Sequence, residues 1–115
     1  MVTLKSINTF LGIVQPKLTT HGFYMLTRPK NLKTLLDLNF SSADVKKTLL
    51  ELKAQDYSQG PLPDKLGAGL DMWVFGKKIQ NREIYIKITK GRENERVLLI
   101  SFHEADGPMR YPFRV

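Results

Sequence analysis

The stretch MWVFGKKIQNREIYIKI, residues 72–88, decides the fold class. In its second half, isoleucines at positions 84, 86 and 88 alternate with polar residues, and this period of two is typical of a strand with one buried face. The pair Gln80-Asn81 interrupts the run with residues that favour a tight turn. The stretch therefore predicts two antiparallel strands, over residues 71–79 and 82–90.

A third strand is expected over residues 96–103, after a polar turn at residues 91–95. Together the three strands predict an antiparallel meander. The alternation within the third strand places Ser101 and His103 on one face. The residues expected on the opposite, helix-covered face are Leu98, Ile100 and Phe102.

Upstream of the meander, the apolar residues follow helical spacing. They recur every three or four positions over residues 3–15, which predicts an amphipathic helix that ends near Pro16. Ser41 and Asp44 have the spacing of a capping box, which predicts the start of a second helix. The buried stripe expected for this second helix is Val45, Leu49 and Leu52.

The segments around these helices carry weaker patterns. Residues 23–27 predict an edge strand or an extended linker, and residues 31–38 predict a brief helix capped by Asn31. Residues 55–70 are rich in glycine and proline and predict a long loop, which is either functional or a plain connector.

Helices followed by strands indicate an α+β fold, with N-terminal helices packed on one face of a C-terminal antiparallel β-sheet. The chain has 115 residues, the length of one ordinary domain, so we expect residues 1–115 to form a single unit. It has no cysteine and two histidines far apart, so we expect no structural zinc site and no cofactor. Its apolar runs are too short for a membrane span, and its start lacks a signal-peptide pattern, which together favour a cytoplasmic protein with no membrane partner.

The charge balance suggests the class of partner. The chain has 18 basic and 11 acidic residues, a net charge of +7, and an isoelectric point near 9.8. Such a balance favours a polyanionic ligand through counterion release, although many basic domains bind no nucleic acid.

Polar side chains on the meander supply candidate chemistry. Tyr85 and Lys87 share the face opposite the isoleucines, and we expect Ser101 and His103 to join them. An imidazole, a phenol and a cation are sufficient for metal-free cleavage of RNA, in which the 2′-hydroxyl loses a proton, the phosphorane is stabilised and the 5′-oxygen gains a proton. Lys87 or Arg110 would stabilise the phosphorane, and His103 would move a proton. The alternative interpretation is an ordinary exposed sheet face.

The order of these segments resembles the MqsR family, the motility quorum-sensing regulator toxins. The resemblance covers residues 4–103. It is carried by Thr27-Arg28, Leu35, Leu38-Asn39-Phe40, residues 45–52, Asp56-Tyr57, Met72-Trp73-Val74-Phe75, Ile84-Tyr85-Ile86-Lys87-Ile88 and Leu99-Ile100-Ser101-Phe102. It implies a RelE-like fold and the activity of a sequence-specific, ribosome-independent mRNA endoribonuclease (an mRNA interferase). It also implies a toxin of a type II toxin–antitoxin system, with mRNA as substrate and a cognate protein antitoxin as partner.

The resemblance also implies roles for individual residues. Tyr85 matches a functional tyrosine of the family, so the catalytic set is expected to be His103, Tyr85 and Lys87, with no metal ligand. Gln59, Val74 and His103 depart from the best-known member, which has lysine, glutamine and lysine there. His103 would then take over proton transfer or phosphate binding.

The remaining site residues are expected to bind substrate, and they are Asp56, Gln59, Arg110 and Tyr111. Residues 104–115 form an extension past the end of the best-known member, and its Arg110 would supply positive charge. Two alternatives stay open. One is a non-catalytic nucleic-acid-binding module that uses Trp73, Phe75 and Tyr85 as a stacking surface. The other is a basic surface that docks an acidic protein.

Overall fold

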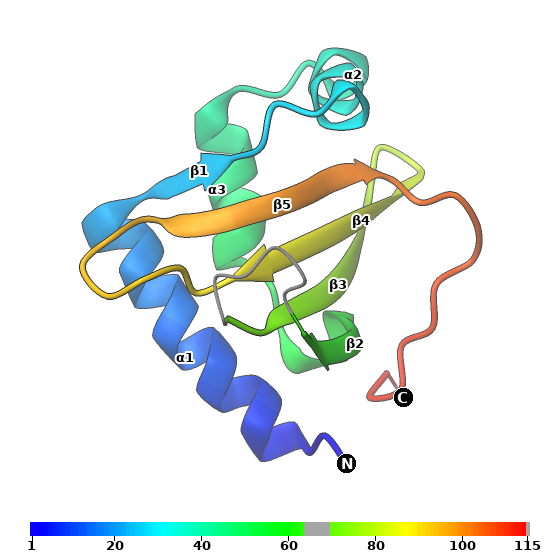
Figure 1. Cartoon of the computed structure of the whole chain (residues 1–115). Helices are drawn as coiled ribbons and strands as arrows, with labels where there is room; N and C mark the ends of the chain where they lie inside the picture. The colour runs from blue at the N-terminus through cyan, green and yellow to red at the C-terminus, as the bar shows by residue number, and fades with distance from the viewer. Residues whose placement is uncertain (64–69, 115) are drawn as a thin grey trace.

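Five strands form one mixed sheet in the order β1-β5-β4-β3-β2 in the computed structural model of the chain, which describes residues 1–63 and 70–114 (Figure 1). The strands are β1 (Phe23–Met25), β2 (Tyr57–Leu62), β3 (Met72–Ile79), β4 (Arg82–Thr89) and β5 (Val97–Glu104). The predicted meander is confirmed as β3, β4 and β5. The sheet is wider than the meander. β1 adds to β5 in parallel, which agrees with the edge-strand alternative for residues 23–27, and β2, which was not predicted, adds to β3 antiparallel.

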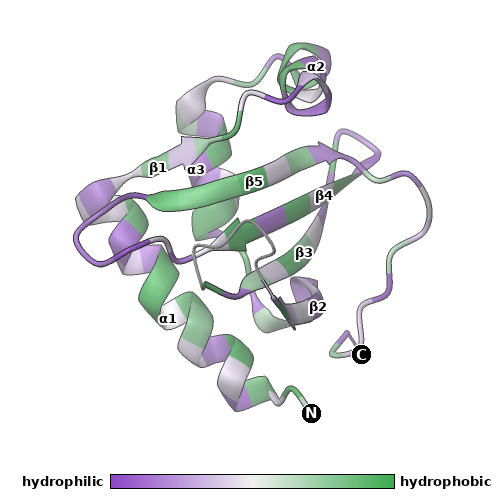
Figure 2. Ribbon diagram, in the orientation of Figure 1, coloured by the Kyte–Doolittle hydropathy of each residue, from purple (hydrophilic) through white to green (hydrophobic). Residues whose placement is uncertain are grey.

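The helices precede the meander, as expected for an α+β fold. They are α1 (Leu4–His21), α2 (Pro29–Leu38), α3 (Ser42–Leu50) and the 3₁₀ turn η1 (Ala54–Asp56). Figure 1 shows α1 and α3 beside the sheet and α2 next to β5. The core lies between the helices and the sheet, where α1 contributes Ile7 and Val14 and β4 contributes its isoleucines. Hydrophobic residues concentrate along these elements, whereas the β4–β5 turn is hydrophilic (Figure 2).

The turn between β3 and β4 is the tight turn that the sequence predicts. Gln80 and Asn81 have φ angles of 51° and 64°. Positive φ at two successive positions gives the backbone twist that matches a two-residue hairpin. The Gln80 amide also donates to the Leu38 carbonyl at 3.0 Å, which ties the turn to the end of α2.

A bulge in β5 overturns part of the predicted alternation. Lys87 pairs with Ser101 but the next residue, Ile88, pairs with Leu99, so Ile100 has no opposite residue on β4. One extra residue reverses the parity of the strand. Phe102 is in the main core cluster with Val97 and Leu99, whereas Ile100 is buried, at 7% exposed, but outside that cluster, and Leu98 is only half-buried.

Helix α1 continues past Pro16 to His21, contrary to the predicted end. Pro16 and Gly12 are both exposed, so the Gly12 carbonyl that loses its helical partner faces water instead of the core. Burial of Leu18, which is 0% exposed, favours one more turn. Gly22 then ends the helix with a φ of 76° and donates its N–H to the Leu18 carbonyl.

The two shorter helices differ in how well their starts are predicted. The capping box of α3 is confirmed, since the Ser41 hydroxyl accepts from the Asp44 N–H and the Asp44 carboxylate accepts from the Ser41 N–H. Asn31 does not cap α2, because Arg28 is the N-cap and Pro29 is the first residue of the helix. Asn31 is instead completely buried.

Part of the predicted loop is strand β2, while residues 64–69 of that prediction lie outside the described residues. Gly60 has a φ of 121°, and a Cβ there would lie 2.9 Å from the Met72 carbonyl oxygen, so glycine permits the close approach to β3. The register shifts near Gln59 and Leu62 accommodate these irregular residues. Within residues 1–63 and 70–114, no helix has the length and apolar character to cross a bilayer.

Candidate active site

The register of β4 and β5 brings the predicted catalytic residues together. Tyr85 pairs with His103, and their rings are stacked with centroids 5.3 Å apart and planes 17° from parallel. Lys87 pairs with Ser101, and its Nζ lies 5.8 Å from the centre of the Tyr85 ring. Since Ile86 and Phe102 are 0% exposed on the core side, these four polar side chains occupy the face that α1 and α3 leave open.

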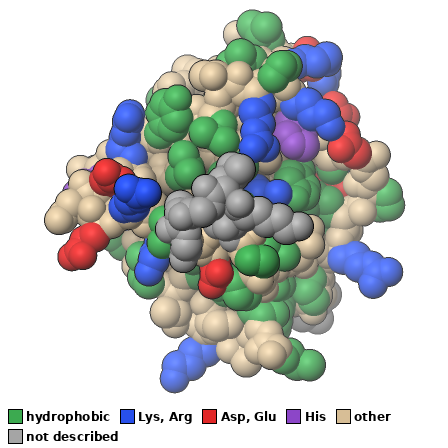
Figure 3. All heavy atoms as spheres, in the orientation of Figure 1, with side chains coloured by type: hydrophobic (Ala, Val, Ile, Leu, Met, Phe, Trp, Pro, Cys, Tyr) green, Lys and Arg blue, Asp and Glu red, His purple; other side chains and the backbone are tan. Residues whose placement is uncertain are grey.

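This face is hollowed into a groove of about 640 Å³. Its floor is the polar side of β4 and β5, and its walls come from the start of α2, from β2 and from the segment that follows β5. The polar and charged side chains that line the groove include Arg28, Lys30, Gln59, Tyr85, Lys87, Ser101, His103, Asp106 and Arg110. Figure 3 shows lysine and arginine side chains beside a histidine on this part of the surface.

The groove is positively charged. Among the described residues its lining includes the cations Arg28, Lys30, Lys87 and Arg110 and one carboxylate, Asp106. Asp106 is paired with Lys30 at 3.1 Å, in a bridge whose partners are both well exposed. The surplus of positive charge therefore favours an anionic ligand such as a phosphodiester.

The hydrogen bonding of His103 defines which nitrogen is free for chemistry. Its Nδ1 lies 2.9 Å from the backbone carbonyl of Glu104. A carbonyl oxygen only accepts, so Nδ1 carries the hydrogen in this contact and Nε2 is left to accept a proton. His103 is half-buried at the groove, which leaves the ring accessible to a ligand.

Tyr85 is suited to donate a hydrogen bond. Burial raises the pKa of its phenol above the ordinary value of 10.0, so the hydroxyl keeps its proton at neutral pH. A neutral phenol beside a cation offers a donor to a phosphate oxygen without adding negative charge.

A buried amide beneath the groove supports this arrangement. Asn31 donates to the Ile100 carbonyl at 3.0 Å and accepts from the Phe102 N–H at 2.9 Å, so it binds the β5 backbone on both sides of Ser101. β1 pairs with β5 only as far as Leu99, so on this side of β5 Asn31 takes the place of a strand partner for the next residues. Its sequence position, two residues after Pro29, has the pattern of a helix cap and gives no indication of this role.

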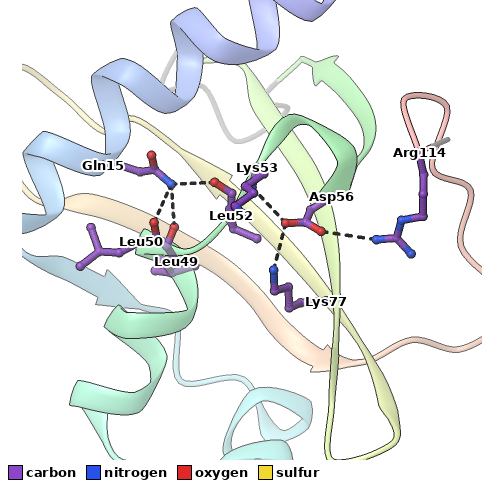
Figure 4. A network of polar contacts seen from close by, with 8 residues as sticks. All are labelled: Gln15, Leu49, Leu50, Leu52, Lys53, Asp56, Lys77 and Arg114. Atoms are coloured by element: carbon purple, nitrogen blue, oxygen red, sulfur yellow. Dashed lines mark hydrogen bonds and ion pairs between the residues drawn. The ribbon is translucent and has the colours of Figure 1, made fainter.

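The predicted substrate-binding residues divide into two pairs. Gln59 and Arg110 line the groove. Asp56 does not, because it is 4% exposed and accepts from the Lys53 N–H, from Lys77 at 3.2 Å and from Arg114 at 3.4 Å (Figure 4).

Tyr111 does not line the groove either, because its hydroxyl donates to Glu83 at 2.8 Å. The polar contacts of Asp56 and Tyr111 are thus within the fold, and the structure does not bring these two residues together with the groove lining.

Two of the aromatic residues of the stacking alternative lie in the core, and two basic lining residues were not predicted. Trp73 and Phe75 form no stacking surface, since they are 9% and 0% exposed and pack on Phe10. The sequence interpretation also missed Arg28 and Lys30 as lining residues. Basic residues at the start of a helix have no distinctive spacing, so only the approach of α2 to β5 places them at the site.

Within residues 1–63 and 70–114, no cluster of three histidine or acidic side chains has the geometry to hold a metal ion. No protein-family model, curated protein or solved structure matches this chain.

Proposed function

We propose that the groove binds single-stranded RNA and cleaves it by attack of a ribose 2′-hydroxyl on the adjacent phosphorus. The observation that carries the proposal is the pairing of Tyr85 with His103 and of Lys87 with Ser101 on the floor of a cationic groove. These groups supply the proton transfer and the charge stabilisation that the reaction needs, with no metal ion among the participants.

In the proposed reaction, Nε2 of His103 accepts the proton of the 2′-hydroxyl. The 2′-oxygen forms a bond to phosphorus, and the bond from phosphorus to the 5′-oxygen breaks. Lys87 and Arg110 stabilise the phosphorane, while the Tyr85 hydroxyl donates a hydrogen bond to it. The departing 5′-oxygen takes up a proton, for which the Lys87 ammonium is a donor on the floor of the groove. The products are a 2′,3′-cyclic phosphate and a free 5′-hydroxyl.

The test uses purified protein and a mixed-sequence RNA in excess EDTA, with the product ends identified by mass spectrometry. We expect cyclic phosphate ends, and no cleavage of the same sequence made with 2′-O-methyl riboses, since the nucleophile is then blocked. Loss of cleavage on chelation would refute the metal-free reaction.

Matched variants test the individual residues. His103→Ala is compared with His21→Ala, since His21 lies at the end of α1 and is exposed. Tyr85→Phe is compared with Tyr24→Phe, since Tyr24 is 45% exposed on β1 and does not line the groove. Removing a general base costs about 10²- to 10⁴-fold in rate. Equal rates for the two histidine variants would remove His103 from the mechanism.

The biological part of the proposal is a cytoplasmic toxin of a type II toxin–antitoxin system that cuts mRNA at specific sequences without the ribosome. It is supported by the motifs of the MqsR resemblance together with the cationic groove. Induced expression in a bacterial host should arrest growth, and His103→Ala should abolish the arrest while His21→Ala keeps it. Mapping the RNA ends produced by purified protein tests both sequence specificity and ribosome independence.

A non-catalytic RNA-binding module is the second candidate function. The observation that favours it is the stacked Tyr85–His103 pair among cations, because bases stack on such aromatic surfaces without sequence preference. This candidate predicts that intact RNA and DNA bind with similar, strongly salt-dependent affinity. Cleavage of RNA by the wild-type protein excludes it as the sole function.

A further inference from the structure

Residues 105–114, here called the C-terminal arm, leave the end of β5 and run past the open side of the sheet (Figure 1). The first part of the arm, residues 105–110, lines the groove. The second part contacts β3, β4 and η1. The arm is therefore both a wall of the groove and a segment attached to the sheet.

One residue of β4, Glu83, holds the arm at three points. Its backbone carbonyl accepts from the Ala105 N–H at 2.8 Å. One carboxylate oxygen accepts from the Met109 N–H at 3.2 Å, and the other accepts from the Tyr111 hydroxyl at 2.8 Å. The bend of residues 105–110 thus begins and ends on the same β4 residue.

The contacts of Glu83 with the arm explain why an acidic residue lies next to the cationic groove. Glu83 belongs to the alternate set of β4 residues that includes Tyr85 and Lys87. A free carboxylate at this position would repel a phosphodiester. Because both oxygens accept hydrogen bonds from the arm, the charge of Glu83 serves to bind the arm.

The far end of the arm is held by close packing. Gly76 pairs with Tyr85 across β3 and β4, and a Cβ at Gly76 would lie 2.8 Å from two ring carbons of Tyr111 and closer still to its hydroxyl oxygen. The Arg114 guanidinium lies 3.9 Å from the centre of the Tyr111 ring and pairs with Asp56 at 3.4 Å. The Tyr111 ring therefore fills a space that only glycine at residue 76 leaves open.

We infer that Glu83, Gly76 and Tyr111 are positioning residues that hold the arm against the sheet and thereby place Arg110 at the groove to bind a phosphate of the RNA. The inference rests on the proposed function, since it assigns Arg110 an RNA phosphate as its ligand. Arg110 is exposed and directly precedes the anchored Tyr111. Anchoring its neighbours reduces the conformational freedom that Arg110 loses when it binds a phosphate.

The test measures the affinity for a fluorescent 2′-O-methyl RNA, which binds without being cleaved, in a double-mutant cycle. Arg110→Ala should weaken binding of wild-type protein about tenfold, as expected for loss of a charge-assisted hydrogen bond. Gly76→Ala displaces the Tyr111 ring, and the substituted residue itself does not line the groove. In the Gly76→Ala background, Arg110→Ala should then change the affinity by less than about twofold, because the arm no longer presents Arg110.

Two more variants keep the test decisive if Gly76→Ala folds poorly. Tyr111→Phe keeps the ring and removes its hydrogen bond to Glu83, and it should also reduce the effect of Arg110→Ala. Gly12→Ala is the control for added bulk, because nothing lies within 4 Å of a Cβ at this exposed position of α1. It should leave both the affinity and the effect of Arg110→Ala unchanged.

Amide hydrogen exchange reports on the arm itself. The Met109 N–H should exchange slowly in the wild-type protein, quickly in Glu83→Ala, and at an intermediate rate in Glu83→Gln, which keeps a side-chain oxygen acceptor. An equal fold-loss for Arg110→Ala in the wild-type, Gly76→Ala and Tyr111→Phe proteins would overturn the inference, as would fast exchange at Met109 in the wild type. If Arg110→Ala has the smaller effect expected in the Gly76→Ala and Tyr111→Phe proteins but the wild-type protein does not cleave RNA, only the proposed reaction is refuted.

Discussion

Replacing Asn31 with alanine should destabilise the protein more than its small change in volume suggests. The Asn31 side chain is 0% exposed and makes three hydrogen bonds to the backbone. Its amide nitrogen donates to the Leu26 and Ile100 carbonyls at 2.9 and 3.0 Å, and its oxygen accepts from the Phe102 N–H at 2.9 Å. Alanine at this position leaves all three backbone groups without a side-chain partner.

The expected loss follows from the number of unpaired groups. A buried donor or acceptor without a partner costs about 1–3 kcal/mol, so three groups with some relaxation predict a loss of about 4 kcal/mol in the free energy of unfolding. Two variants on the same helix provide the scale. Thr34→Ala removes one acceptor, for the Glu104 N–H, and should cost about 1 kcal/mol. Leu36→Ala, at a site 82% exposed, should change stability by less than about 0.5 kcal/mol.

Urea unfolding at neutral pH measures the free energies of unfolding of the three variants. The comparison requires that the slope of the free energy against urea concentration is the same in each variant. Asn31→Asp separates lost hydrogen bonds from lost volume, because it keeps the shape and one acceptor but removes the two donated bonds. It should be at least as destabilising as Asn31→Ala. A free energy for Asn31→Ala within about 1 kcal/mol of that for Leu36→Ala would refute the role assigned to Asn31, since exposed changes lie in that range.

Three further predictions concern the helices and the hairpin. The hydrogen bond from the Ser41 N–H holds the pKa of Asp44 below its ordinary value of 3.8, so the wild-type urea midpoint should fall as the pH drops below that value, and Asp44→Ala should flatten this dependence. Gln15→Ala removes an amide that reaches the carbonyls of Leu49 and Leu50 at the end of α3 and of Leu52 just after it (Figure 4), and it should cost about 1–2 kcal/mol by urea unfolding. Asn81→Gly, at a φ of 64°, should raise the thermal midpoint, with a gain of about 0.5–1 kcal/mol at most.

Several features of the candidate site follow from residues close together in the sequence. Tyr85 and Lys87 share a face because a strand has a period of two, and Ile84 and Ile86 show which face is buried. The tight turn at Asn81 then makes β3 and β4 neighbours. These features need only local geometry, so the sequence pattern predicts them.

The partners of the polar side chains do not follow from local pattern. Asp56 and Tyr111 have side chains of the kind that bind ligands. In the fold, however, Asp56 forms an ion pair with Arg114, and the Tyr111 hydroxyl donates a hydrogen bond to Glu83. Asn31 has the position of a cap but binds the β5 bulge. In each case the deciding contact joins residues more than twenty positions apart, and neither the periodicity of a strand nor the chemistry of a cap contains that information.

The sequence by itself determined the α+β class, the meander, the capping box of α3 and the polar face of β4, because hydrophobic periodicity and turn chemistry act over a few residues. Only the tertiary structure decided the bulge at Ile100, the second edge strand β2, and the arm that forms one wall of the groove. The physical reason is that each buried backbone group must find a hydrogen-bond partner wherever the folded chain supplies one. The assembled groove therefore depends on pairings between distant segments, such as Asn31 with β5 and Tyr111 with Glu83.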